Sequence, residues 1–331
     1  MATAVNHFPF LNTPLFNTII ISFSNVWHIS WISYWSGHYY YHGAHVFPII
    51  EKNDLAAKVY RYVIEAPHIV KKARAGQFVI LRLHEGGERI PITLADWDVA
   101  HGTITLYVQA VGKTTIMMSM MKTGDSLMDV VGPFGIPSHV EKGKTFVAIG
   151  GGFGIAAIHP IVRAHKLIGN RTISIIGARS KELLLMENEM RAISDEVRIA
   201  TDDGSYGTKG FVTTILKSML EKKEAVDVVL AIGPVVMMKA VSDLTRPLGV
   251  QTLVSLNPIM MDGTGMCGAC RVVVGNKMQF ACVDGPEFDA HAVDFDLLVA
   301  RQKMYSPQEK ISMDIFEKIC ETQEHRETAA W

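Results

Sequence analysis

The chain of 331 residues lacks a strong net charge, because its 32 lysines and arginines nearly balance its 33 aspartates and glutamates. A balanced surface gives no electrostatic reason to expect nucleic acid or another polyanion as a partner. The sequence also lacks internal repeats and low-complexity tracts. Its length is sufficient for two or three domains with ample hydrophobic core.

Cysteine is scarce, with four residues in the whole chain. Three of them, Cys267, Cys270 and Cys282, fall within sixteen residues, whereas Cys320 stands alone and is given no role. A disulfide-stabilised secreted domain carries more cysteines in a shorter chain. The local cluster therefore predicts a metal site in a reducing compartment, and we expect the chain in the cytoplasm.

Long hydrophobic runs are also missing. The segment 11–41 is rich in Ile, Phe, Trp and Tyr, but Asn, Ser and His interrupt it before about 20 apolar residues accumulate. It has neither a basic n-region nor a convincing signal-peptidase site. We predict that residues 1–45 are an N-terminal extension outside the fold, and that globular structure begins at Val46. A weak membrane anchor is the alternative.

The fold class expected from the remaining pattern is β followed by α/β. Residues 46–142 contain short alternating runs broken by Gly and Pro, which predict a small antiparallel β-barrel. Its expected strands include 59–64, 77–83 and 103–108, and a short helix is expected over 114–121.

From residue 143 to 250 strands and helices alternate, which is typical of a parallel, doubly wound sheet. We expect strands at 146–149, 172–176, 197–201 and 226–232, and helices at 155–167, 183–193 and 211–222. A metal-binding segment follows at 251–290. The C-terminal tail, 291–331, is expected to contain one helix from Ser306 to about residue 321, because Ser and Pro open it in favourable capping positions.

The metal-binding segment contains Asp262, Cys267 and Cys270, followed after eleven residues by Cys282. This is the C-x4-C-x2-C spacing of plant-type [2Fe–2S] ferredoxins with Asp in the first position. The intervening glycines let one loop wrap a cluster and aim its amides at the sulfides. A hairpin around Gly275 and Asn276 returns the last cysteine to the loop.

Two alternatives to that cluster, and one to the ligand role of Asp262, stay open at this point. A carboxylate can bind iron as a thiolate does, but Asp262 could instead only cap its turn. A zinc site is less favoured, because zinc sites more often have two paired CxxC units. Three buried structural thiols would leave the density of glycines unexplained.

Two glycine turns suggest nucleotide binding. Gly150, Gly151, Gly152 and Gly154 join a strand to a helix, where backbone amides can approach a pyrophosphate. This is not a complete GxGxxG motif, and a tight structural turn is the alternative. Around Gly112 the string VGKTT is similar to a P-loop, but Tyr107 stands where that motif needs glycine, so ATPase activity is rejected.

The string Arg89-Ile-Pro91-Ile-Thr93 places a basic group and a hydroxyl on one face of an extended strand. They could hold the phosphate and the isoalloxazine edge of a flavin. A surface arginine without a ligand is the usual alternative.

Taken in order, these strings resemble the ferredoxin–NADP reductase superfamily. Further strings support the resemblance, which covers about four-fifths of the chain from Val46 to Glu321; they are Gly132–Gly135, Gly177–Ser180, Thr201–Gly207 and Gly233-Pro234. The chain is similar to the branch that contains the electron-transfer subunit of dihydroorotate dehydrogenase. The same branch contains the small subunit of NADH-dependent ferredoxin:NADP oxidoreductase, also called sulfide dehydrogenase.

The resemblance implies that the chain is an NAD(P)-dependent flavin iron–sulfur oxidoreductase and assigns its residues. It places FAD on the barrel and NAD(H) on the doubly wound domain, and it gives no residue a catalytic acid–base role. The residues implied for FAD are Arg89, Pro91, Thr93, Gly112, Thr114 and Thr115. Those implied for NAD(H) are Gly150, Gly151, Gly152, Gly154, Arg179, Ser180, Asp203 and Gly233; those for the cluster are Asp262, Cys267, Cys270 and Cys282.

Asp262 distinguishes two members of that branch. By resemblance, the dihydroorotate members have four cysteines, whereas an Asp takes the first place in the electron-bifurcating transhydrogenase. The implied partner is a larger flavoprotein with FAD and [4Fe–4S] clusters, and ferredoxin would be reached indirectly. The alternatives are a dihydroorotate dehydrogenase electron-transfer subunit and a non-enzymatic redox module. We expect NAD rather than NADP, although no acidic residue follows the second strand to select a ribose hydroxyl.

Overall fold

The structure is a computed structural model that describes residues 46–328, with side chains described as far as residue 320. The prediction made for residues 1–45 lies outside the described residues. Among those that are described, no helix combines the length and the apolar character needed to cross a membrane.

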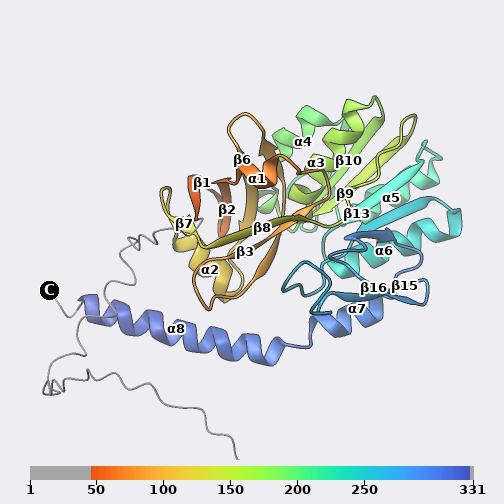
Figure 1. The fold of residues 1–331 in the computed structure, drawn as a ribbon. Coiled ribbons are helices and arrows are strands. Elements are labelled where there is room, and N and C mark those ends of the chain that lie inside the picture. Colours follow the sequence, from red (N-terminus) through yellow and green to blue (C-terminus); the bar gives the residue numbers. More distant parts are fainter. Residues whose placement is uncertain (1–45, 329–331) are drawn as a thin grey trace, which may run out of the picture. The chain divides into compact units, whose positions relative to one another are not determined.

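The first part of the fold consists of two antiparallel sheets (Figure 1). One has five strands in the order β5-β6-β2-β1-β7, and the other has three in the order β4-β3-β8. Their bounds are β1 Phe47–Ala56, β2 Val59–Glu65, β3 Phe78–Arg82, β4 Ile90–Thr93, β5 Asp96–Asp98, β6 Thr103–Gln109, β7 Ser126–Leu127 and β8 Asp129–Phe134. The two short helices are α1 Pro67–Val70 and α2 Lys113–Met120.

Both sheets enclose one hydrophobic core. Alternate residues of β2 and β6 point inward, and they meet Val79 and Leu81 of β3 in the same buried cluster. Helix α2 closes one end and is fixed there by its last turn, because the Tyr62 hydroxyl donates to the Met118 carbonyl at 2.7 Å. This bond does not involve the first turn of α2, at Lys113 and Thr114, which makes other contacts.

The second part is a seven-stranded sheet in the order β12-β11-β10-β9-β13-β14-β17, parallel except for the last strand. Its strands are β9 Thr145–Gly151, β10 Arg171–Ala178, β11 Glu196–Thr201, β12 Thr208–Lys209, β13 Val228–Ile232, β14 Gln251–Ser255 and β17 Glu287–Asp289. The chain starts at β9, adds strands on one side and then on the other. The carboxyl end of β9 is therefore the topological switch point, where such sheets bind ligands.

Helices cover both faces of this sheet, and its central strands are buried on both sides (Figure 1). Helices α3 (Gly154–Leu167) and α4 (Glu187–Ile193) pack on one face. Helices α5 (Val212–Glu221) and α6 (Val235–Thr245) pack on the other. This agrees with the predicted barrel and doubly wound sheet, so the fold class is confirmed.

The cysteine segment forms a small unit on the α5–α6 side. Strands β15 (Arg271–Val274) and β16 (Lys277–Phe280) make the predicted hairpin, with Asn276 in the left-handed conformation that a tight turn requires. Its apolar side chains join the core of the large sheet and also meet Phe78 and Phe134 of the barrel. Helices α7 (Phe295–Gln302) and α8 (Ser306–Thr328) complete the described chain.

Three local predictions were wrong or incomplete. The helix expected over 183–193 begins only at Glu187, because Met186 is left-handed and a short 3-10 helix occupies 181–183. The buried Leu185 holds this segment in place through tertiary packing. The terminal helix runs to Thr328 rather than to about residue 321, and α6 and β14 were not predicted.

Candidate cofactor sites

The cysteine loop folds around a pair of thiols. Cys270 and Cys282 are both buried, and their sulfur atoms lie 3.2 Å apart without a disulfide bond. A tetrahedral metal bound at about 2.3 Å to each thiolate holds two sulfurs roughly 3.8 Å apart, so a small outward movement would admit one ion. The third cysteine, Cys267, is exposed at the loop surface.

The surroundings of the pair also change the acidity of one thiol. Burial, followed by the neighbouring Cys270 thiol, raises the pKa of Cys282 to about 12. A buried thiol of this kind is uncharged at neutral pH, and metal coordination is the ordinary reason for a thiolate in such a place. The donor set and the wrapped loop thus fit an iron–sulfur cluster.

Asp262 begins the loop and holds its backbone. Its carboxylate accepts hydrogen bonds from the Thr264 amide at 2.9 Å and from the Cys267 amide at 2.8 Å. These bonds keep the pKa of Asp262 below its usual range, so the side chain is anionic. Within the described residues no three His, Cys, Asp or Glu side chains converge as a metal group. The structure therefore shows Asp262 in the capping arrangement, and its role as a ligand stays a prediction.

Three glycines give the loop its path. Gly263, Gly265 and Gly268 have φ angles of 77°, 81° and 66°, which other residues adopt only with strain. Gly263 also lies directly under the Phe134 ring, since an added Cβ would come within 2.7 Å of it. The cluster loop thus touches the last strand of the barrel, on which FAD is predicted.

The turn predicted for flavin phosphates lies at the start of α2. Gly112 precedes the helix, and the Thr115 hydroxyl accepts from the Val111 and Gly112 amides at 3.1 and 3.0 Å. Thr115 therefore shapes the turn with its own side chain. An added Cβ on Gly112 would meet no atom within 4 Å, so the space beside the turn is open.

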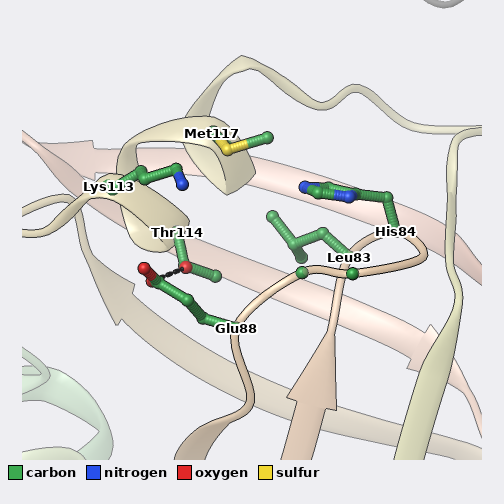
Figure 2. Close-up of a pocket in the computed structure, with 8 residues that line it drawn as sticks. Leu83, His84, Glu88, Lys113, Thr114 and Met117 are labelled. Atoms are coloured by element: carbon green, nitrogen blue, oxygen red, sulfur yellow. Dashed lines mark hydrogen bonds between the residues drawn. The ribbon is translucent and has the colours of Figure 1, made fainter. Parts of the chain in front are cut away.

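Figure 2 shows what faces this turn. The Thr114 hydroxyl donates to the Glu88 carboxylate, and Lys113 and Met117 lie opposite the loop that carries Leu83 and His84. Sequence reasoning missed Glu88, although it directly precedes Arg89. A carboxylate at the start of a helix takes the place that a phosphate would favour, for the same electrostatic reason.

The string predicted to bind flavin lies at β4, and its Arg89 directly precedes the strand. This strand lies at the edge of its sheet, where proline is tolerated because one side of the strand needs no donor. Pro91 pairs with Ile80 and Thr93 pairs with Phe78, so both side chains project to the same face. Arg89 is exposed, and within the described residues it makes no ion pair. This open cation, the edge strand and the helix start fit a flavin with its phosphates.

The residues predicted for NAD(H) gather at the carboxyl edge of the parallel sheet. The Gly152 amide donates to the Gly177 carbonyl at 2.9 Å, and the Asp203 amide donates to the Arg179 carbonyl at 3.2 Å. Ser180 follows Arg179, and Asp203 accepts from the Ser205 amide and hydroxyl at 2.9 and 2.6 Å. The turns after β9, β10 and β11 therefore meet, as parallel strands require.

The glycines of this edge have two different tasks. A Cβ on Gly154 would lie 1.9 Å from the Ile232 carbonyl oxygen, and one on Gly151 would lie 2.5 Å from the Met237 sulfur. One on Gly150 would come within 2.9 Å of Ile155, and one on Gly233 within 2.8 Å of Met237. Only Gly152 is left-handed and faces open space. Close packing therefore explains why glycine stands at the other four positions, whereas at Gly152 the open space would let a ligand approach the backbone.

One polar contact between distant segments had no signal in the sequence. The Ser138 hydroxyl donates to the Glu287 carboxylate, which joins the segment after the barrel to β17. Next to it, the Ile136 amide donates to the Gly285 carbonyl at 2.6 Å. Burial raises the pKa of Glu287 to about 7. These contacts fix the cysteine segment against the barrel.

Comparison with known proteins identifies the family. Residues 257–294 match the model of the iron–sulfur cluster-binding domain of dihydroorotate dehydrogenase B. The dihydroorotate dehydrogenase B (NAD(+)) electron transfer subunit homolog of Thermotoga maritima is 48% identical over 270 residues, which cover 82% of this chain and 95% of the relative. The chain belongs to the dihydroorotate dehydrogenase B electron-transfer subunit family.

Comparison with solved structures supports this family assignment. A structure of the NADH-dependent reduced ferredoxin–NADP oxidoreductase, described in work on flavin-based electron bifurcation, is 46% identical with a TM-score of 0.78. The match covers 83% of this chain and 99% of that one. A ferredoxin–NADP+ reductase from Neisseria gonorrhoeae with bound FAD and NADP is 18% identical, has a TM-score of 0.52 and shares the fold over 62% of this chain and 91% of its own.

These findings confirm the family resemblance. They also confirm the cofactor prediction of FAD, an iron–sulfur cluster and NAD(H) at the level of the domain family and the fold. The chain is an oxidoreductase subunit of the electron-transfer kind. The individual site residues and the domain boundaries at 46–142, 143–250, 251–290 and 291–331 stay predictions.

Proposed function

We propose that this chain carries electrons between NAD(H) and a larger flavoprotein subunit through FAD and a [2Fe–2S] cluster. A bound flavin exchanges a hydride with nicotinamide and single electrons with a cluster, so it belongs between the two. The arrangement of the predicted residues supports this order. The barrel that would hold FAD packs against α3, the helix that begins at the nucleotide edge of the sheet, where the His159 ring meets the Ala95 carbonyl at 3.2 Å. The barrel also touches the cysteine loop, where Gly263 lies against Phe134.

The protein's own residues would position these groups. Arg89 and the start of α2 would bind the flavin phosphates, while Pro91 and Thr93 would line the edge of the isoalloxazine ring. The NAD(H) site would use the turns after β9, β10, β11 and β13. We infer that Asp262, Cys267, Cys270 and Cys282 bind the cluster, with Asp262 turning away from its two amides to do so.

We further propose that the complex is an electron-bifurcating transhydrogenase that couples NADPH, ferredoxin and NAD. The observation that carries this is the anionic Asp262 at the first ligand position of a loop that otherwise has cysteine spacing. The similarity to the NADH-dependent reduced ferredoxin–NADP oxidoreductase structure supports it. The partner would be a larger subunit with FAD and [4Fe–4S] clusters, and the complex would work in the cytoplasm.

A second candidate is the electron-transfer subunit of a dihydroorotate dehydrogenase. It is favoured by the name of the Thermotoga maritima relative and by the domain matched at 257–294. Purification of the native complex under anaerobic conditions separates the two. NADPH-dependent reduction of ferredoxin that requires NAD⁺ supports the transhydrogenase, whereas dihydroorotate-dependent reduction of NAD⁺ without that coupling would replace it.

A further inference from the structure

Helix α7 lies beside β15 and ends against the cysteine loop (Figure 1). Its last two residues each reach the segment that carries the loop. The Gln302 side chain donates to the Asn257 carbonyl at 2.9 Å, and the Nη2 atom of Arg301 donates to the Ala269 carbonyl at 3.0 Å. One end of α7 therefore fixes both the approach to the loop and the loop itself.

The guanidinium group of Arg301 is only partly satisfied. Apart from its bond to Ala269, it makes no hydrogen bond and no ion pair with the residues that the structure describes. Its Nε atom is buried, and no other buried side-chain nitrogen or oxygen in that part of the chain lacks a partner. Buried cations are normally paired, so an unpaired buried donor of this kind points to a group that the polypeptide itself does not supply.

The Ala269 carbonyl lies within the loop, between Cys267 and Cys270 in the sequence. In a trans peptide the carbonyl oxygen and the amide hydrogen point in opposite directions. The bond from Arg301 to this carbonyl therefore turns the Cys270 amide away from the guanidinium group. Within residues 46–328 that amide donates to no other group, so it stays available to a sulfur atom of a cluster.

We propose that Arg301 is a positioning residue that raises the reduction potential of the cluster. Reduction adds one electron, and hence one negative charge, to a cluster whose proposed ligands are already anionic. A partly buried cation beside the loop stabilises that added charge, because solvent screens it less than it screens an exposed cation. Hydrogen bonds to the sulfurs and nearby charges are the means by which a protein sets such a potential. This inference rests on the proposed [2Fe–2S] site.

The test measures the midpoint potential of the cluster in the full-length protein. The protein is titrated anaerobically with dithionite while the electron paramagnetic resonance of the reduced cluster is followed. Arg301→Gln keeps a donor for the Ala269 carbonyl but removes the charge. It is expected to lower the equilibrium constant for reduction about tenfold, which is about 59 mV for a one-electron couple. Arg301→Lys keeps the charge and should change the constant by less than about twofold.

The matched control is Lys303→Gln, which removes a charge directly after the same helix at an exposed position. It should also change the constant by less than about twofold, because solvent screens an exposed charge. Iron content and thermal melts of all three variants show whether the cluster and the fold are retained.

The outcomes separate this inference from the function on which it rests. An unchanged potential in Arg301→Gln, or an equal shift in Arg301→Lys or Lys303→Gln, would overturn the role of Arg301 while the cluster assignment survives. If Arg301→Gln loses its iron, a normal cluster in Arg301→Lys supports the need for the charge. Loss of iron in both variants would make Arg301 a structural support of the loop and overturn the inference. A wild-type chain that holds no [2Fe–2S] cluster would overturn the proposed function as well.

Discussion

Residues 150–154 and residues 262–270 are both glycine-rich, but the structure uses glycine in them for different reasons. In the first turn, Gly154 has no space for a Cβ, because the Ile232 carbonyl lies 1.9 Å from the place it would occupy. In the cysteine loop, Gly268 has no neighbour closer than 3.7 Å, but its φ is 66°. Gly154 is therefore needed for the close packing of α3 on β13, and Gly268 for the direction of the backbone.

The largest effect is expected at the thiols of the cysteine loop, where a substitution tests whether the loop binds a metal. Cys270→Ser should abolish the cluster, because it removes a buried ligand and leaves an oxygen with lower affinity for iron. Iron content and visible absorbance of anaerobically prepared protein measure this. Cys320→Ser is the control and should keep both signals. Undiminished iron in Cys270→Ser, or zinc in the wild-type chain, would contradict the assignment of the loop.

The second-largest effect is expected from close packing in the turn at residues 150–154, which is predicted to bind NAD(H). Gly154→Ala should lower the free energy of unfolding by about 2–3 kcal/mol, since its methyl group would press on backbone that cannot move aside as a side chain can. Urea denaturation measures the change. Gly152→Ala is the matched control. Its Cβ meets no atom, so it should cost only about 1 kcal/mol for the left-handed conformation.

The stability of the segment that carries the cysteine loop should depend on pH, because Glu287 lies in that segment. Glu287 has a folded pKa of about 7, above its usual 4.5. The folded state therefore binds the proton more tightly, so the stability that this group contributes is lost as pH rises from about 4.5 to about 7. Glu287→Gln should stabilise the protein by about 1–2 kcal/mol at pH 8 and by little at pH 4. Thermal melts at the two pH values measure this, and an equal shift at both would refute the assignment.

The smallest effect is expected where the loop needs only backbone direction. Gly268→Ala should cost about 1 kcal/mol, because its Cβ has space but its φ is unfavourable. The loss should be similar to that of Gly152→Ala and clearly smaller than that of Gly154→Ala. If Gly268→Ala were the most damaging of the three, packing rather than backbone direction would govern the loop.

Much of the fold followed from local patterns. The strands of the barrel alternate in polarity, and the later strands are short buried runs separated by helical segments, so both periods can be read without a structure. The spacing of Asp262 and the three cysteines also indicated one loop around a metal. These features depend on residues close together in the chain, because the short covalent path between such residues limits where their side chains can lie relative to one another.

Tertiary structure decided what distant residues do to one another. Leu185 and Met186 lie outside the helix that was predicted to include them. Their packing in the buried cluster of the sheet, rather than their helix propensity, sets their conformation. The Glu88 contact with Thr114 and the Glu287 contact with Ser138 join residues 26 and 149 positions apart, which no local pattern reports. Helix α8 lies beside α2 only because the C-terminal segment returns to the barrel. The sequence by itself determined the periods and the ligand spacing, and only packing determined which surfaces meet.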